Sequence, residues 1–210
     1  MEIKPCKLIF WDFDGVIKDS VEVKTHAFEY LFPDGDADFL RKVRMHHEAN
    51  GGMSRFDKIP LYLHWSGQPI DENQIEKYLL KFSEKVVEGV IHAPWVPGAR
   101  EYLLSNWISC YYVLLTATPQ EEIIRILRHL GISHCFREVY GSPINKREVV
   151  SKVLKKHNIK SSEALLIGDS EVDLFAAETN FVPFLLRSTV LNKNLQEVYM
   201  GPQFENFENE

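Results

Sequence analysis

The pattern of apolar and polar positions changes character along the chain. Short, continuous apolar runs, which are typical of buried strands, occur near the N-terminus and again throughout the second half. They predict strands at residues 8–11, 111–115, 136–140, 164–167 and 182–186. Between residues 20 and 90, by contrast, apolar residues recur at helical spacing, which predicts four successive helices and no strand.

Strands and helices alternate in the second half, and this alternation indicates the fold class. It predicts an α/β fold with a Rossmann-like, doubly wound parallel sheet and helices on both faces. The four earlier helices have no sheet of their own, so we expect a helical-bundle cap inserted after the first strand. We place the core domain at residues 1–16 and 94–210 and the cap domain at 17–93. The joining segments, 16–20 and 91–94, are the expected hinges.

The composition of the chain limits its possible binding partners and indicates its cellular compartment. A formal net charge of −6 argues against nucleic acid or an anionic membrane as a partner. The sequence has no run of about 18 apolar residues, and its first residues lack the apolar core of a signal peptide. Cys6, Cys110 and Cys135 are an odd number without metal-type spacing, so we expect reduced thiols and a cytoplasmic protein. The polar, acidic tail 201–210 is expected to be peripheral.

Two aspartates follow the first predicted strand directly. In extended chain, residues two positions apart point the same way, so Asp12 and Asp14 face one side together. Carboxylates this close repel each other unless a cation or a shared proton compensates. Gly15 then allows a turn without Cβ strain. On these residues alone, a metal or phosphate site and a simple Asp-Gly hairpin are equally good interpretations.

Two further strands also end in residues that carry chemistry. Thr116 follows the strand at 111–115, and Asp169 and Asp173 follow the strand at 164–167. Ligands bind at the carboxyl ends of strands in such sheets, so we expect these residues to gather beside the aspartates of the first strand. A hairpin at the first strand would not explain why the other two strands also end in such residues.

Other conspicuous residues have ordinary structural interpretations. Thr118 is expected to be the N-cap of the helix that follows the strand at 111–115. His46 and His47 are a tempting metal pair, but adjacent helix residues do not face each other, so we expect both at the surface. Lys146, taken alone, is compatible with a solvated lysine at a helix start.

Taken together, four stretches resemble the motifs of the haloacid dehalogenase superfamily. In chain order they are Asp12-Phe13-Asp14-Gly15-Val16, Thr116 after an apolar strand, Lys146, and Gly168-Asp169-Ser170-Glu171-Val172-Asp173. The resemblance covers roughly residues 7–190, and the first and fourth motifs are its specific parts. The inserted helices resemble the small helical cap of the phosphoglycolate phosphatase and β-phosphoglucomutase branch.

The resemblance implies a role for each motif residue. Asp12 would be the nucleophile that forms an aspartyl-phosphate, and Asp14 would protonate the leaving group and then activate water. Thr116 and the backbone N–H of Ala117 would hold phosphate oxygens, while Lys146 would neutralise charge.

The resemblance also implies Mg²⁺ as the cofactor, a cation that prefers oxygen ligands. Asp12, the backbone carbonyl of Asp14, and Asp169 would supply those ligands. Asp173 would support the metal shell or orient Lys146.

In the cap, residues 50–57 resemble the substrate-specificity loop of the β-phosphoglucomutase branch. Arg55 is therefore a candidate to bind a carboxylate, phosphate or hydroxyl of the substrate. Lys24 stands where that mutase carries a histidine tied to its proton chemistry, and this departure weakens the mutase interpretation. A lysine there would instead contact an anionic group.

These features predict a Mg²⁺-dependent phosphatase that hydrolyses a small phosphorylated metabolite, with a sugar phosphate as the leading candidate. The expected partner is a small-molecule phosphate ester, and no oligomeric state is predicted. A phosphosugar mutase is the first alternative. A phosphonate hydrolase would need a Schiff-base lysine in the cap, for which Lys58 lies nearest the loop, and would depart from the second aspartate, whereas Asp14 is present. A non-catalytic binding protein would usually have lost one of the motif residues, and all are intact.

Overall fold

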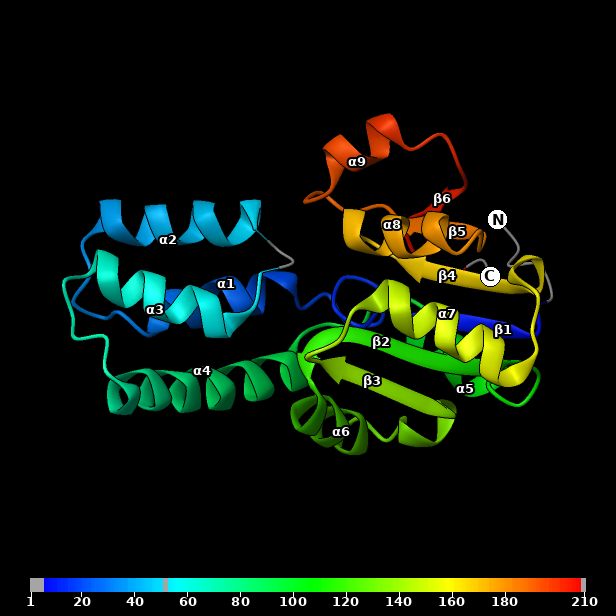
Figure 1. The fold of residues 1–210 in the computed structure, drawn as a ribbon, viewed down its shortest axis with the longest axis horizontal. Coiled ribbons are helices and arrows are strands. Elements are labelled where there is room, and N and C mark those ends of the chain that lie inside the picture. Colours follow the sequence, from blue (N-terminus) through cyan, green and yellow to red (C-terminus); the bar gives the residue numbers. More distant parts are fainter. Residues whose placement is uncertain (1–5, 51–52, 209–210) are drawn as a thin grey trace. The chain divides into compact units, whose positions relative to one another are not determined.

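The computed structural model describes residues 6–50 and 53–208, which fall into two compact units (Figure 1). The core unit comprises Met1–Asp19 and Pro94–Glu210, and the cap unit comprises Ser20–Ala93. None of the helices in the described residues is long and apolar enough to cross a membrane.

The first boundary lies between 19 and 20 rather than between 16 and 17. Hydrogen bonds to the core explain the difference. The backbone N–H of Lys18 donates to the carbonyl of Phe13 at 3.2 Å, and that of Asp19 donates to Pro94 at 2.9 Å.

The core unit is built on one sheet of parallel strands in the order β3-β2-β1-β4-β5-β6, as far as the described residues show. The strands are β1 (Leu8–Trp11), β2 (Tyr111–Pro119), β3 (Glu138–Ser142), β4 (Ala164–Gly168), β5 (Phe184–Arg187) and β6 (Gln203–Phe204). From β1 the chain builds the sheet outward in both directions. The carboxyl end of β1 is therefore the switch point at which such sheets bind ligands.

Helices connect these strands and cover both faces, which confirms the predicted α/β class. They are α5 (Ala99–Asn106), α6 (Gln120–His129), α7 (Lys146–His157), α8 (Glu171–Thr179) and α9 (Lys193–Val198), with short 3₁₀ turns at Ser133–Cys135 and Ser161–Glu163. The strands predicted at 136–140 and 182–186 begin two residues later, at Glu138 and Phe184. The first shift follows the 3₁₀ turn, and the second reflects Pro183, which has no N–H to donate to a ladder.

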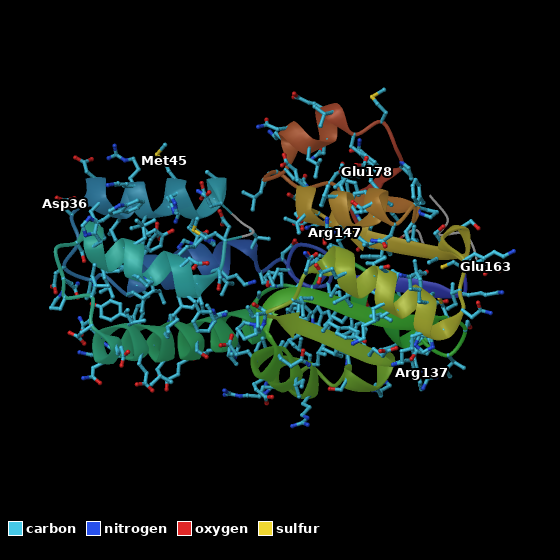
Figure 2. The ribbon with its side chains drawn as sticks, in the orientation of Figure 1. Asp36, Met45, Arg137, Arg147, Glu163 and Glu178 are labelled. Atoms are coloured by element: carbon cyan, nitrogen blue, oxygen red, sulfur yellow. The ribbon has the colours of Figure 1, made fainter. Side chains whose placement is uncertain are left out.

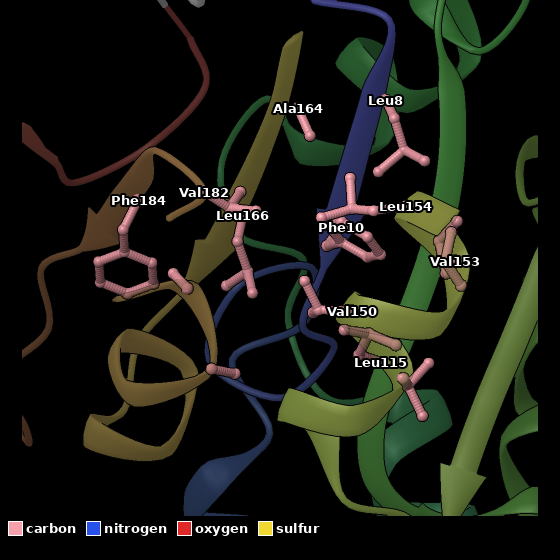
Figure 3. Packing of buried hydrophobic residues seen from close by; sticks show 14 of the residues in the cluster. Leu8, Phe10, Leu115, Val150, Val153, Leu154, Ala164, Leu166, Val182 and Phe184 are labelled. Atoms are coloured by element: carbon pink, nitrogen blue, oxygen red, sulfur yellow. The ribbon is translucent and has the colours of Figure 1, made fainter. Parts of the chain in front are cut away.

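One face of the sheet packs against α7 and α8 (Figure 3). Phe10 of β1, Leu115 of β2 and Leu166 of β4 belong to one buried cluster with Val150 and Val153 of α7. Burying each such side chain contributes about 1.5–3 kcal/mol. This packing fixes α7 over β1, and so places the first residue of that helix near the carboxyl end of the strand.

The opposite face of the sheet carries an aromatic cluster. Trp11 points away from its neighbour Phe10 along the strand, and its ring lies 5.9 Å from Tyr102, 5.3 Å from Tyr112 and 5.6 Å from Phe207. The expectation of a peripheral tail is therefore wrong for its described part. Phe207 is 3% exposed, and β6 pairs with β5. The sequence did not predict this packing, because Phe204 and Phe207 are isolated aromatic residues in a polar segment and form no periodic pattern.

The four helices predicted for the cap unit are present. They are α1 (Val21–Tyr30), α2 (Ala37–Ala49), α3 (Arg55–Trp65) and α4 (Glu72–His92). Phe28 lies at the centre of their packing, with its ring 5.3 Å from Tyr62 and 4.2 Å from Phe82. Asp36 caps α2 by accepting from the backbone of Phe39, and Met45 projects outward from that helix (Figure 2).

The cap unit overturns the expectation that both adjacent histidines lie at the surface. His47 is buried, and its ring packs 4.9 Å from Phe28. It accepts a hydrogen bond at Nδ1 from the buried Nζ of Lys58 at 2.8 Å. His46 is only partly exposed and bonds to the hydroxyl of Tyr62 at 3.0 Å. His47 is buried because its side of α2 packs against the apolar cluster around Phe28. The spacing of residues along the helix did not reveal this contact.

Glu138, at the start of β3, accepts hydrogen bonds from four side chains. It accepts from Tyr111 at 3.0 Å, Tyr140 at 2.6 Å, Lys156 at 2.8 Å and His157 at 2.6 Å. Burial alone would raise its pKa, but these donors hold the pKa of Glu138 at about 2. Folding therefore favours the ionised carboxylate.

We expect Glu138→Gln to lower the free energy of unfolding at neutral pH by about 1–3 kcal/mol. The folded pKa lies below the ordinary 4.5, so the contribution of the charge is complete above about pH 4.5 and is lost as pH falls toward 2. Denaturant unfolding across this range should show the two proteins converging at low pH. Glu197→Gln, at an exposed position, is the control. A deficit that is constant with pH would contradict the assignment.

Candidate active site

The residues predicted to carry chemistry lie where β1, β2 and β4 end. Asp12 follows β1 directly and Asp169 follows β4, while Thr116 lies within β2. Strand β2 runs on to Pro119, beyond the predicted end at 115, with a register shift between Leu115 and Pro119. The backbone N–H of Asp12 donates to Ile167 of β4 at 3.0 Å, which ties the two strand ends together.

A buried lysine joins two of the aspartates. Lys146, the first residue of α7, donates from Nζ to Oδ1 of Asp12 at 2.8 Å and to Oδ1 of Asp173 at 2.7 Å. Its side chain is 8% exposed and that of Asp173 is 1% exposed, so the interaction is largely removed from water. Burial lowers the pKa of Lys146, but the two carboxylates outweigh it and hold the pKa above its ordinary value. Lys146 is therefore a buried partner of two carboxylates and not a solvated helix-start residue.

The second oxygen of Asp173 is also bonded. Ser170, the N-cap of α8, donates from Oγ to Oδ2 of Asp173 at 2.5 Å. Gly168 makes room for this arrangement, because a Cβ there would overlap the Cβ and Cγ of Asp173. With both oxygens engaged, Asp173 is well suited to hold the lysine in place.

Three carboxylates share this small volume. Asp12, Asp169 and Asp173 each offer one oxygen, and these oxygens lie within 4.8 Å of one another. Burial and the charge of Asp173 raise the pKa of Asp12 to about 7 despite the adjacent lysine. Burial and the charges of Asp12 and Asp173 raise the pKa of Asp169 well above its ordinary value. The negative charge of this cluster exceeds what one ammonium compensates, so its oxygen donors fit a divalent cation.

Asp14 is partly exposed and has a partner that the sequence pattern did not reveal. Oγ1 of Thr118 donates to Oδ2 of Asp14 at 3.2 Å, and the backbone N–H of Thr118 donates to Oγ1 of Thr116 at 3.1 Å. The expectation that Thr118 caps α6 is wrong, because β2 continues through it and the N-cap is Pro119. The spacing of Thr116, Ala117 and Thr118 could have indicated this contact, because in a strand it puts both threonine side chains on the same side.

The turn after Asp14 does not form a hairpin. Gly15 has φ 76°, in the left-handed region that favours glycine. Its N–H donates to Lys18 at 2.8 Å, and the chain then leaves the sheet. The strands beside β1 are β2 and β4, both parallel to it, so the hairpin interpretation is wrong.

Two residues near the C-terminus position the site loops. The buried guanidinium of Arg187 donates to the carbonyl of Gly15 at 3.1 Å and to Oδ1 of Asp19 at 2.5 Å. The side-chain amide of Asn192 donates to the carbonyl of Asp169 at 2.7 Å and to that of Arg187 at 2.9 Å. These contacts join segments distant in sequence, and no local pattern indicated them.

The remaining predicted residues lie in different places. Ala117 is exposed on β2 beside the buried Thr116. Lys24 lies on α1 and Arg55 opens α3, with its guanidinium 4.7 Å from the ring of Phe82. Both residues belong to the cap unit, whereas the aspartates belong to the core unit. Gly51 and Gly52 of the predicted specificity loop lie outside the described residues.

Comparisons with known proteins found phosphoglycolate phosphatases among the relatives of this chain. The phosphoglycolate phosphatase of Pseudomonas savastanoi pv. phaseolicola is 24% identical over 180 residues, which cover 82% of this chain and 65% of that protein. The chain thus spans less than two thirds of this relative. The phosphoglycolate phosphatase of Vibrio cholerae is 24% identical over 186 residues, covering 84% of this chain and 81% of the relative.

A solved structure shows the same fold. CbbY from Rhodobacter sphaeroides, in complex with phosphate, has a TM-score of 0.75 at 14% identity, covering 97% of this chain and 96% of CbbY. In addition, a family model described as haloacid dehalogenase-like hydrolase matches residues 9–186. That match spans the strand-end aspartates and Lys146, and the chain belongs to the haloacid dehalogenase-like hydrolase family.

Proposed function

We propose that this chain is a Mg²⁺-dependent phosphatase that hydrolyses a small phosphorylated metabolite through an aspartyl-phosphate. The observation that carries the proposal is the Asp12 carboxylate, which sits at the sheet's switch point with a buried ammonium 2.8 Å away and two further carboxylates beside it. Because the curated relatives are phosphoglycolate phosphatases, 2-phosphoglycolate is the first substrate to test, followed by sugar phosphates.

In the first step, a carboxylate oxygen of Asp12 attacks phosphorus while the bond from phosphorus to the ester oxygen breaks. Lys146 orients Asp12 and favours its ionised form, since its ammonium contacts Oδ1. Asp14, partly exposed and held by Thr118, gives a proton to the leaving oxygen. Thr116 and the N–H of Ala117 hold phosphoryl oxygens during the transfer.

In the second step, water attacks phosphorus of the aspartyl-phosphate. Asp14, now ionised, accepts a proton from that water, and Asp12 is regenerated as a carboxylate. Asp173 touches no reacting atom in this scheme. It holds Lys146, and through Lys146 it positions the nucleophile.

Asp12, the backbone carbonyl of Asp14, and Asp169 would hold Mg²⁺. The bound cation supplies positive charge against the phosphoryl oxygens. The raised pKa values of Asp12 and Asp169 support this assignment, because they reflect burial of the carboxylates together with the negative charge of the neighbouring aspartates.

The cap unit supports a substrate with an anionic group besides its phosphate. Lys58 is buried beside His47, and burial with the nearby charge of Lys24 lowers the pKa of Lys58 to about 8. Burial and the charges of Lys58 and Lys24 lower the pKa of His47 to about 3, so the imidazole is neutral and Lys58 donates to it. We propose that Arg55 and Lys24 bind a carboxylate or second phosphate, as the sequence resemblance suggests.

A phosphonate hydrolase is the second candidate function. The lowered pKa of Lys58 favours it, because a neutral amine is the form that attacks a carbonyl. Asp14 opposes it, since that chemistry departs from the second aspartate. A mutase is distinguished by its product, which is an isomer of the substrate and not inorganic phosphate.

We expect Asp12→Asn to lower kcat for phosphate release at least about 10³-fold, because an amide is not a nucleophile. Borohydride added during turnover should reduce an aspartyl-phosphate at Asp12, and peptide mass spectrometry should find homoserine at that position. Asp38→Asn, which makes the same charge change at an 87% exposed position of α2, is the control. Label at Lys58 would favour the phosphonate hydrolase, and phosphate release unaffected in Asp12→Asn would exclude the proposed mechanism.

We expect Mg²⁺ to raise the thermal stability of EDTA-treated protein, by about 2.7 kcal/mol at a hundred times its Kd. Asp169→Asn should abolish this gain and, in the metal-free state, should itself stabilise the protein, because it removes a buried carboxylate that the neighbouring aspartates repel. Asp38→Asn, whose carboxylate is 87% exposed on α2, is the control and should keep the full Mg²⁺ response. An equal response in Asp169→Asn would show that the cation binds elsewhere.

We expect Arg55→Met to raise KM for 2-phosphoglycolate about tenfold, with kcat changed less than about twofold, because the lost contact is made equally in ground and transition states. Ethyl phosphate, which lacks the carboxylate, should show no such change. Arg41→Met, at a 66% exposed arginine of α2, serves as the matched control. Equal penalties for both esters would mean that Arg55 does not recognise the anionic group.

A further inference from the structure

Two cysteines meet at the end of the sheet where the strands begin. Cys6 lies just before β1 and Cys110 just before β2, and their Sγ atoms are 3.9 Å apart. The N–H of Tyr111 donates to the carbonyl of Lys7 at 3.0 Å, which fixes the two chain segments beside each other. Both thiols are free and partly exposed, whereas Cys135 is fully buried.

We propose that Cys6 and Cys110 are an oxidisable dithiol site that forms an intramolecular disulfide with low-molecular-weight disulfides such as oxidised glutathione. A disulfide needs its sulfurs about 2.0 Å apart, so the two atoms must approach by about 1.9 Å. Cys6 and Cys110 both precede the first residue of their strands, and rotation of side chains at such positions leaves the ladder between β1 and β2 unchanged. The proposal does not depend on the proposed phosphatase activity.

The pKa values of the two thiols shift in opposite directions, and this difference indicates which thiol attacks first. Either Sγ can donate in the contact between the two thiols, and donation by Cys110 lowers the pKa of Cys6. The same hydrogen bond, together with burial, raises the pKa of Cys110. The thiolate is the nucleophile in disulfide exchange, so Cys6 attacks first and Cys110 resolves the intermediate.

Oxidation of the two thiols proceeds by two successive thiol–disulfide exchanges. The Cys6 thiolate attacks one sulfur of oxidised glutathione, forming a mixed disulfide and releasing one glutathione thiolate. Cys110 then loses its proton to solvent, and its thiolate attacks Sγ of Cys6 and displaces the second glutathione. The two protein thiols are oxidised by two electrons, and the glutathione disulfide is reduced to two thiols that take up the two protons.

The site is remote from the aspartate cluster. Cys6 and Asp12 are separated by the whole of β1, a distance of about 20 Å at about 3.3 Å per strand residue. The disulfide would close a loop that contains the cap unit, because residues 20–93 lie between the two cysteines. Closing so long a loop restricts the unfolded chain, so oxidation should stabilise the protein and leave the chemistry of the strand ends intact.

The test is incubation of the folded, full-length protein with oxidised glutathione, followed by alkylation and non-reducing peptide mapping. We expect a peptide pair joined through Cys6 and Cys110 in monomeric protein, reversed by dithiothreitol, and a rise in Tm of about 5 °C or more. Cys135→Ser is the control and should form the same link. Cys6→Ser should form no internal link, and Cys110→Ser should stop at glutathione attached to Cys6.

Four results would overturn the proposal. They are complete alkylation of Cys6 and Cys110 after incubation, a stable glutathione adduct on Cys6 in the unsubstituted protein, a link through Cys135, and a disulfide between two chains. Because the mapping is done first on the unsubstituted protein, the test remains decisive even where a variant fails to fold.

Discussion

The buried ammonium of Lys146, held between Asp12 and Asp173, is the interaction on which the core site depends. It joins the end of β1 to the first turns of α7 and α8, three elements far apart in sequence. Removing one member of a buried ionic group leaves an uncompensated charge, which costs about 3–5 kcal/mol. The same interaction orients the nucleophile, so stability and chemistry rely on the same atoms.

The lysine neutralises the cluster only in part. Asp12 and Asp169 keep raised pKa values despite it, so the core unit carries unfavourable electrostatic energy at this strand end. Such local instability is typical of functional sites, where selection favours reactivity over packing. The aromatic cluster around Trp11 and the apolar face around Phe10 stabilise the sheet on both sides of the strand that carries the aspartates.

Much of the core could be predicted from the sequence, because short apolar runs that end in Asp, Thr or Gly-Asp report both a buried strand and its polar end. Asp12 and Asp169 were found in this way. Thr118, Arg187 and Asn192 were missed because their contacts with Asp14, Gly15 and Asp169 join distant segments. Burial of His47 was missed for a related reason, since it depends on packing between cap helices. The periodicity of a sequence indicates which side of a helix or strand is apolar. It does not indicate which polar groups from distant segments contact each other in the folded chain.

In the proposed mechanism, Asp12 attacks phosphorus while the pair of Lys146 and Asp173 stays intact. A crystal structure of the protein with Mg²⁺ and beryllofluoride, a mimic of an acyl-bound phosphoryl group, tests it most directly. We expect beryllium bonded to a carboxylate oxygen of Asp12, with the cation on Asp12 and Asp169 and the Lys146–Asp173 contact preserved. Beryllofluoride bonded to another residue, or a cation that displaces Lys146 from Asp173, would contradict the account.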